Sequence, residues 1–436
     1  MFFTKITDKY INKCDLQYIK MITEISIENY LSIKEKVVFS LDSTPSKNLE
    51  QNLIKLQNKN ILKTAVIYGA NASGKSNLIK SVFYIWFLVK NSHLFNIETK
   101  LNKINPARTP FKLDSSCLNK PSKFEILFIH EDIKYKYGFS CDNEGIIEEY
   151  LYHSPKGRGA LIFSRTDYTK FKFTEDKAQQ DIITKQMNKN VLYLSRATQL
   201  GYHKTRFAYE FIINNIVINP NRSDLTIREI YENKKSKNKF LEVLRRADFG
   251  GILDLEVSKE KRKVDGSEFK FENKVASMNQ LKDKEEDFFD VKFVHENENK
   301  ELIRLSPQEE SSGTRKTLEM LGPIFDVLRN GKTAFIDEFE LNLHPNITEF
   351  LIKLFHSKHN TKNGQLVITT HDTTLLKNKN LFRRDQVYIC SKAPNKWTEI
   401  NSLIDFDLRE SLSFENAYLN GRVGGLPFID NSFFED

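Results

Sequence analysis

Short apolar runs that end in polar residues or glycine predict the strands of a buried sheet. Three such runs cover residues 64–68, 333–336 and 365–370. A pattern with the 3.6-residue period of an amphipathic helix follows the first run at residues 77–86, and a second such pattern occupies residues 314–328. The order of these patterns predicts an α/β protein.

Alternation of apolar and polar residues predicts a second group of strands. Residues 22–42 have the pattern of two strands, and residues 124–141 and 145–153 have that of further strands in a hairpin sheet. Residues 43–60 are polar and predict a loop. Between residues 200 and 300, Lys- and Asn-rich stretches separate helical patterns, so we expect a compact, mainly helical insertion with a short β return.

Composition narrows the class of protein. The chain has 436 residues, of which 39% are hydrophobic, and this is enough for a sizeable core and excludes a disordered protein. Its four cysteines form no C-x-x-C pair, so we expect neither a zinc site nor a disulfide framework, and a location in the reducing cytoplasm. No apolar run reaches transmembrane length, which predicts no membrane association. Residues 1–20 precede Met21 as an extension for which we predict little role in the fold.

The turn after the first apolar run has the pattern of a phosphate-binding P-loop. Two glycines are separated by four residues and followed by Lys and Ser, between a predicted strand and a predicted helix. In this context backbone N–H groups and the positive end of the helix face phosphate oxygens, the lysine reaches the outer phosphates, and the serine hydroxyl binds Mg²⁺. The candidate nucleotide-binding residues of this loop are Gly69, Asn71, Gly74, Lys75, Ser76 and Asn77.

Two later strands end in residues suited to nucleotide chemistry. Asp337 and Glu338 follow residues 333–336, where Asp337 can hold Mg²⁺ and Glu338 can act as general base toward water. His371 follows the run that begins at residue 365. Acids at the end of a strand, or a lone histidine, are weak signals alone, but the ends of parallel strands at the sheet edge of the P-loop are where ligands bind.

A polar turn opens the predicted helix at residues 314–328. Ser311, Ser312, Gly313 and Thr314 have the composition of an ordinary N-cap. The alternative is a second anion-binding helix start, which would contact the γ-phosphate of a nucleotide held by another subunit. We favour the second interpretation because the turn occurs together with the P-loop, the two acids and His371.

The order of these four elements resembles the ABC-type ATPase heads of the RecF, SMC and OLD group. Within that group the chain is similar to the bacterial defence ATPases represented by RloA, AbiL and AriA. The stretches that carry the resemblance, besides the P-loop and the turn, are residues 27–33, 110–114, 124–128, 247–252, 337–345 and 418–427. Two departures are Ser312 and Thr314, where a transporter signature has Gly and Gln, and the lack of an identifiable glutamine for the Mg²⁺ shell.

The resemblance implies an ABC-type head with a parallel P-loop sheet and an antiparallel β-subdomain. The two ATPase lobes would comprise residues 21–200 and 301–436, with the insertion at residues 201–300. It also implies a homodimer, or a higher oligomer, that encloses ATP and Mg²⁺. Ser311 and Gly313 would act as signature residues toward the other subunit, Asp337 as metal-side acid, Glu338 as catalytic base and His371 as switch histidine. The resemblance further implies an ATPase that serves anti-phage defence and controls a separately encoded, nuclease-like effector.

Other interpretations stay open on the residues alone. The net charge of +8 and the lysine and arginine clusters between residues 234 and 263 are compatible with nucleic-acid binding, although interleaved acids favour a solvated helix face. A RecF-like DNA clamp is therefore the alternative function. Arg196 and His203 have the spacing of an RNA-cleaving motif, which we interpret as coincidence. His356 and His359 are expected at the surface of a helix end.

Overall fold

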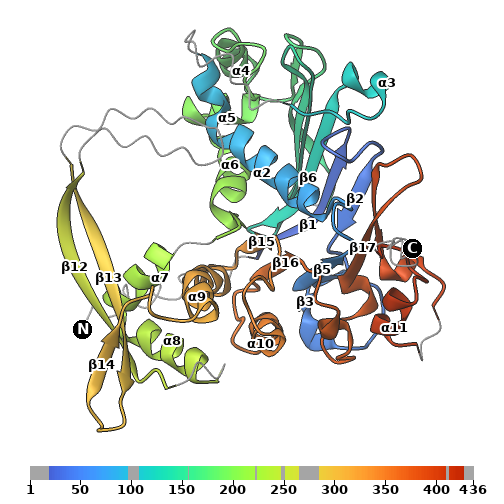
Figure 1. The fold of residues 1–436 in the computed structure, drawn as a ribbon. Coiled ribbons are helices and arrows are strands. Elements are labelled where there is room, and N and C mark those ends of the chain that lie inside the picture. Colours follow the sequence, from blue (N-terminus) through green and yellow to red (C-terminus); the bar gives the residue numbers. More distant parts are fainter. Residues whose placement is uncertain are drawn as a thin grey trace, which may run out of the picture. The chain divides into compact units, whose positions relative to one another are not determined.

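The computed structural model describes residues 19–96, 108–155, 157–220, 223–246, 251–264, 284–408 and 412–426 (Figure 1). They form two compact units. The first unit comprises the described residues of Met1–Asn219, Asp326–Leu341 and Thr348–Asp436, and the second unit those of Pro220–Phe325 and Asn342–Ile347. Of the predicted features, residues 1–18 of the N-terminal extension, residues 247–250 and Pro427 lie outside the described residues.

A six-stranded sheet in the first unit has the order β11-β15-β16-β5-β17-β18. Neighbouring strands are parallel from β11 to β17, and β18 pairs with β17 in the antiparallel sense. The bounds are β5 Thr64–Tyr68, β11 Ile216–Ile218, β15 Thr333–Ile336, β16 Gln365–Thr369, β17 Val387–Lys392 and β18 Thr398–Ser402. Every residue of β5, β15 and β16 is buried, as their apolar runs predict. Because β5, β15 and β16 are parallel, their carboxyl ends meet at one edge of the sheet.

A seven-stranded antiparallel sheet in the same unit has the order β10-β9-β8-β7-β6-β1-β2. Its strands are β1 Lys20–Glu28, β2 Val37–Ser40, β6 Ser122–His130, β7 Ile133–Cys141, β8 Ile146–Ser154, β9 Ala160–Arg165 and β10 Phe171–Phe173. Helix α2, Lys75–Asn91, contributes Leu78, Val82 and Ile85 to one hydrophobic core with strands of both sheets. The predicted α/β class, with a parallel P-loop sheet and an antiparallel sheet, is confirmed.

The remaining elements of the first unit connect and cover these sheets. The strand pair β3 Leu53–Lys55 and β4 Asn60–Leu62 lies where the sequence predicted only a loop. The helices are α3 Ser115–Leu118, α4 Lys177–Thr184, α5 Tyr193–Gln199, α6 His203–Asn215, α10 Pro345–His356 and α11 Phe414–Leu419. The 3₁₀ helices are η1 Glu50–Asn52, η2 Ser92–Asn96, η4 Thr373–Leu376, η5 Arg384–Gln386 and η6 Leu403–Asp405. In the described residues, no helix combines the length and the apolar character that a membrane crossing requires.

The second unit combines helices with a strand ribbon. Its elements are α7 Ser223–Glu232, α8 Lys234–Arg246, β12 Asp254–Val264, β13 Lys284–Glu296, β14 Leu302–Leu305 and the start of α9 Ser312–Asn330. β12 pairs with β13 along its whole length, and β14 pairs with the end of β13. These strands are longer than the short β return expected in a mainly helical segment. The many charged side chains of β12 and β13 hide the apolar signal by which strands are usually recognised.

One predicted surface residue is buried. His356 ends α10 with only 8% of its surface exposed, and its Nε2 lies 2.8 Å from Thr64 Oγ1 at the start of β5. Burial lowers the pKa of His356 to about 3, and the charges of Lys63 and Lys353 act in the same direction. The expectation of a surface position was wrong because His356 follows Phe355 and Ile352 on the apolar side of α10. His359, just beyond the helix, is exposed as expected.

Candidate nucleotide-binding site

The loop between β5 and α2 requires glycine at two positions. Gly74 is the N-cap of α2 and has a φ of +112°, in the region that side chains disfavour. A Cβ atom on Gly74 would lie 2.1 Å from Thr398 Oγ1, and one on Gly69 would lie 2.2 Å from the carbonyl oxygen of Cys390. The loop backbone therefore lies directly against β17 and β18. This close approach explains both glycines of the motif in terms of packing as well as ligand access.

A chain of hydrogen bonds braces the loop from behind. Asn77 Nδ2 donates to Ser32 Oγ at 2.5 Å, and Ser32 Oγ lies 2.6 Å from Thr398 Oγ1. Thr398 Oγ1 in turn donates to the carbonyl oxygen of Ser73 at 2.7 Å. Since Thr398 uses its own proton on Ser73, the Ser32 hydroxyl must donate to Thr398. The predicted nucleotide-binding residue Asn77 thus has a bracing contact with the turn after β1.

Lys75 lies inside the loop with only 6% of its surface exposed. Its Nζ donates to the carbonyl oxygens of Gly69 at 2.8 Å and Ala70 at 3.0 Å. An ammonium group has three N–H donors, so one is left for a phosphate oxygen. Burial lowers the pKa of Lys75, whereas the carboxylates of Asp337 and Glu338 act in the opposite direction.

The two acids after β15 share one buried hydroxyl. Thr369 Oγ1, at the end of β16, donates to Asp337 Oδ1 at 2.6 Å and accepts the backbone N–H of Glu338 at 2.9 Å. The Asp337 N–H donates to Asn219 Oδ1 at 2.7 Å. Glu338 has a φ of +49°, a left-handed conformation that is strained for any residue except glycine. Its side chain is exposed and free to meet a ligand.

His371 is held by a carboxylate that follows the two acids. Its backbone N–H donates to Glu340 Oε1 at 2.6 Å. Glu340 Oε2 is buried and has no hydrogen-bond partner among the described residues. Burial, and then the positive charge of Lys75, lower the pKa of His371 below its ordinary value near 6.5. The imidazole of His371 is therefore neutral around pH 7, as a residue beside an ammonium group should be.

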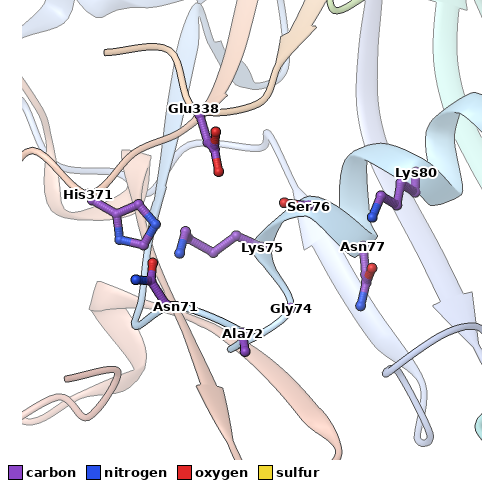
Figure 2. Close-up of a pocket in the computed structure, with 9 residues that line it drawn as sticks. All are labelled: Asn71, Ala72, Gly74, Lys75, Ser76, Asn77, Lys80, Glu338 and His371. Atoms are coloured by element: carbon purple, nitrogen blue, oxygen red, sulfur yellow. The ribbon is translucent and has the colours of Figure 1, made fainter. Parts of the chain in front are cut away.

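These elements surround one cavity of about 220 Å³ (Figure 2). Its lining residues are Asn71, Ala72, Gly74, Lys75, Ser76, Asn77, Lys80, Glu338 and His371. Figure 2 shows the Lys75 side chain extending from the start of α2 toward His371, with the Glu338 side chain above it in this view. Seven predicted site residues thus line a single cavity. Asp337 precedes Glu338 in the chain, and its carboxylate accepts the hydrogen bond from the Thr369 hydroxyl. Their individual roles stay predictions.

The side chains fit a nucleoside polyphosphate with Mg²⁺. The helix start and Lys75 supply donors and positive charge for phosphates. Ser76 and Asp337 offer the oxygen ligands that Mg²⁺ prefers. Among the described residues, no group of three His, Cys, Asp or Glu side chains could hold a metal. A magnesium ion here would consequently depend on phosphate oxygens and water for most of its ligands, as is usual for Mg²⁺ at phosphate sites.

Sequence reasoning missed several residues of the site. Lys80 lies one helical turn after Ser76, and this spacing could have revealed it. Thr369, Glu340 and Asn219 carry no local signal, because their contacts join segments that are distant in the chain. The tertiary structure alone assigns them to the site.

The predicted signature turn lies in the second unit. Ser311 Oγ accepts the N–H of Thr314 at 3.0 Å, so Ser311 is the N-cap of α9. The Ser311 side chain is exposed, and Gly313, in the first turn of the helix, is half-buried. His295 Nε2 lies 2.6 Å from Glu310 Oε1 and ties the turn to β13. Both interpretations of the turn are compatible with this geometry, and the role of Ser311 and Gly313 toward another subunit stays a prediction.

Comparison with protein families matches residues 65–377 to the family described as "AAA domain, putative AbiEii toxin, Type IV TA system". The chain belongs to this AAA family. The match runs from the P-loop strand to η4 just beyond His371 and so includes every candidate site residue. As a member, the protein has the nucleotide-binding P-loop domain of this class. A comparison with curated proteins finds no match.

Solved structures similar to this AAA-family chain include SMC heads. One is an SMC head bound to the C-terminal winged-helix domain of ScpA, with 15% identity and a TM-score of 0.45, covering 91% of this chain and 99% of that one. Another is the SMC head domain from Thermotoga maritima, with 12% identity and a TM-score of 0.39, covering 87% and 98%. A third is an SMC head domain with an extended coiled coil, bound to the C-terminal domain of ScpA derived from Pyrococcus furiosus. It has 15% identity and a TM-score of 0.37, and the match covers 93% of this chain and 99% of that one.

Proposed function

We propose that this AAA-family protein binds ATP with Mg²⁺ and hydrolyses it. The observation that carries the proposal is the convergence of Lys75, Glu338 and His371 on one cavity at the start of α2. Phosphoryl transfer to water requires cations for the phosphates and a residue that orients or deprotonates the attacking water. Lys75 fits the first requirement, and Glu338 with the neutral imidazole of His371 fits the second.

Each residue has a part that follows from its surroundings. Lys75 and the first N–H groups of α2 bind and orient the phosphates. The exposed carboxylate of Glu338 accepts a proton from a water molecule in line with the γ-phosphate. Neutral His371 donates a hydrogen bond to the γ-phosphate or accepts one from the attacking water. Ser76 and Asp337 would hold Mg²⁺, directly or through water. The metal, when bound, supplies positive charge that offsets charge on the phosphates.

The proposed assembly is a dimer in which Ser311 and Gly313 of one subunit contact the nucleotide held by the other. The start of α9 supports this proposal, because Ser311 is exposed there and N–H groups at a helix start attract anions. The family's description, which refers to a toxin–antitoxin system, supports a role in bacterial defence with a separately encoded partner. We propose a nuclease-like effector as that partner, under control of the nucleotide state, and a cytoplasmic location.

The substitution Glu338→Gln tests the proposal because it removes the base and keeps the shape of the side chain. We expect ATP hydrolysis to fall at least about 100-fold, since general-base catalysis contributes about 10²- to 10⁴-fold. ATP should still bind, so the variant should accumulate as an ATP-dependent dimer in light scattering coupled to size-exclusion chromatography. Glu144→Gln is the matched control, because Glu144 is an exposed hairpin residue paired with Lys189. Normal hydrolysis by Glu338→Gln would contradict the assignment.

A RecF-like DNA clamp is the second candidate. It is favoured by Lys234, Lys235 and Lys239, which are exposed on α8. Lys237 and Lys259 of the same basic region instead form ion pairs with Asp254 and Asp287, each at 2.8 Å. DNA-stimulated hydrolysis that is lost when the three exposed lysines are changed to Gln would support the clamp. Hydrolysis that is indifferent to DNA and RNA would support the defence role.

A further inference from the structure

Thr369 makes a pair of hydrogen bonds that no motif of the chain indicates. It is the last residue of β16 and is completely buried. Its Oγ1 donates to Asp337 Oδ1 at 2.6 Å and accepts the Glu338 N–H at 2.9 Å, and its carbonyl oxygen accepts the Phe339 N–H at 3.0 Å. One hydroxyl therefore connects the carboxylate of one acid to the backbone of the next.

The direction of these bonds has a chemical consequence. A hydroxyl has a single proton, which Thr369 uses on Asp337, so Asp337 Oδ1 is the acceptor of this bond and the Thr369 oxygen is the acceptor of the bond from Glu338. The same oxygen satisfies the Glu338 N–H, which in a sheet protein would otherwise need water or another carbonyl. Glu338 is in the left-handed region, which is unfavourable for a residue with a side chain. The bond from its N–H to Thr369 offsets this cost and fixes the direction in which its carboxylate leaves the backbone.

We propose that Thr369 is a positioning residue that sets both acids for ATP hydrolysis. This inference rests on the proposed function. Thr369 lies behind the acids and does not line the cavity, so it acts on the nucleotide only through Asp337 and Glu338. Loss of the hydroxyl frees the Asp337 carboxylate to rotate and removes the acceptor from a strained segment. Nucleotide affinity depends mainly on the P-loop and should change little.

The test compares Thr369→Val, which removes the hydroxyl at nearly constant shape, with Thr369→Ser, which keeps it. For Thr369→Val we expect kcat to fall about 100-fold, the loss expected when a reacting group is displaced by about 1 Å. Binding of a fluorescent ATP analogue should stay within about threefold, and the Mg²⁺ concentration for half-maximal rate should rise. Thr369→Ser should restore kcat to within about fivefold of the wild type, because both bonds can form again.

Thr333→Val is the matched control. Thr333 is a buried threonine at the opposite end of β15, and its Oγ1 donates to Gln365 Oε1 at 2.9 Å, far along the strand from the acids. It should lower the melting temperature about as much as Thr369→Val and leave kcat close to that of the wild type. Should Thr369→Val not fold, Thr369→Ala removes the hydroxyl together with the γ-methyl group and places no new methyl group against the Glu338 N–H.

The outcomes separate the two levels of the proposal. A wild type that hydrolyses ATP, together with a Thr369→Val variant within about threefold of its kcat, overturns the positioning role alone. The same applies if Thr369→Val and Thr369→Ser lose activity equally. A wild type that binds ATP without hydrolysing it overturns the proposed function and this inference with it.

Discussion

Acid should destabilise this protein through His356, which is buried as a neutral imidazole against Thr64. The perturbation is a change of pH from about 7.5 to about 5, in the wild type and in His356→Gln. Glutamine cannot take up a proton in this range, yet its amide can still form a hydrogen bond with Thr64 Oγ1. The comparison of the wild type with His356→Gln therefore separates the effect of protonating His356 from the effect of losing its hydrogen bond with Thr64.

The magnitude follows from the two pKa values of His356. In the unfolded chain the pKa is about 6.5. In the folded protein burial lowers the pKa to about 3. Between these values the unfolded state binds a proton that the native state does not, so stability is lost as the pH falls below 6.5. At about pH 5 this difference lowers the free energy of unfolding by about 2 kcal/mol, since each pKa unit is worth about 1.4 kcal/mol.

Urea unfolding at both pH values, followed by far-UV circular dichroism, measures the effect. The pH-dependent loss in the wild type minus that in His356→Gln should be about 2 kcal/mol, because the other titrating groups cancel in this difference. His359→Gln is the control. Because His359 is exposed, the stability of this variant should change with pH as that of the wild type does. Equal pH dependence in the wild type and His356→Gln would refute the reasoning.

Two further predictions concern the nucleotide site. Gly74→Ala should weaken binding of a fluorescent ATP analogue more than about 10-fold, because its Cβ would meet Thr398 Oγ1 at 2.1 Å. Gly201→Ala, with a φ of +84° but open space around its Cβ, should bind normally, and equal binding by the two variants would contradict the packing argument. Glu340→Ala should lower ATP turnover about 10-fold, because it removes the acceptor of the hydrogen bond from the His371 backbone N–H. A hydrogen bond to a charged acceptor is worth about 1.5–3 kcal/mol. Glu340→Gln keeps an acceptor oxygen and should retain most activity in the same steady-state assay, so equal losses would argue against this contact.

The sequence by itself was sufficient where structure depends on neighbouring residues. The P-loop is a strand, a turn with two glycines and a helix start, all within residues 64–91, so its own residues predict each part. The clash that excludes a side chain at either glycine, in contrast, comes from the distant strands β17 and β18. The positions of Asp337, Glu338 and His371 could also be predicted, because buried strands are short apolar runs and the residue after such a run lies at the sheet edge. The order of the strands within the sheet carried no such local signal.

Only the tertiary structure decided the contacts between segments that are distant in the chain. Thr369 binds the acids across two parallel strands, Ser32 and Thr398 brace the P-loop, and His356 is buried against the start of β5. A threonine or histidine has the same local pattern whether its polar group meets solvent or another strand. Its hydrogen bonds depend on which strands become neighbours, and that is a result of packing the whole core. Sequence therefore determined which chemical groups reach the sheet edge, while the fold determined how they are held there.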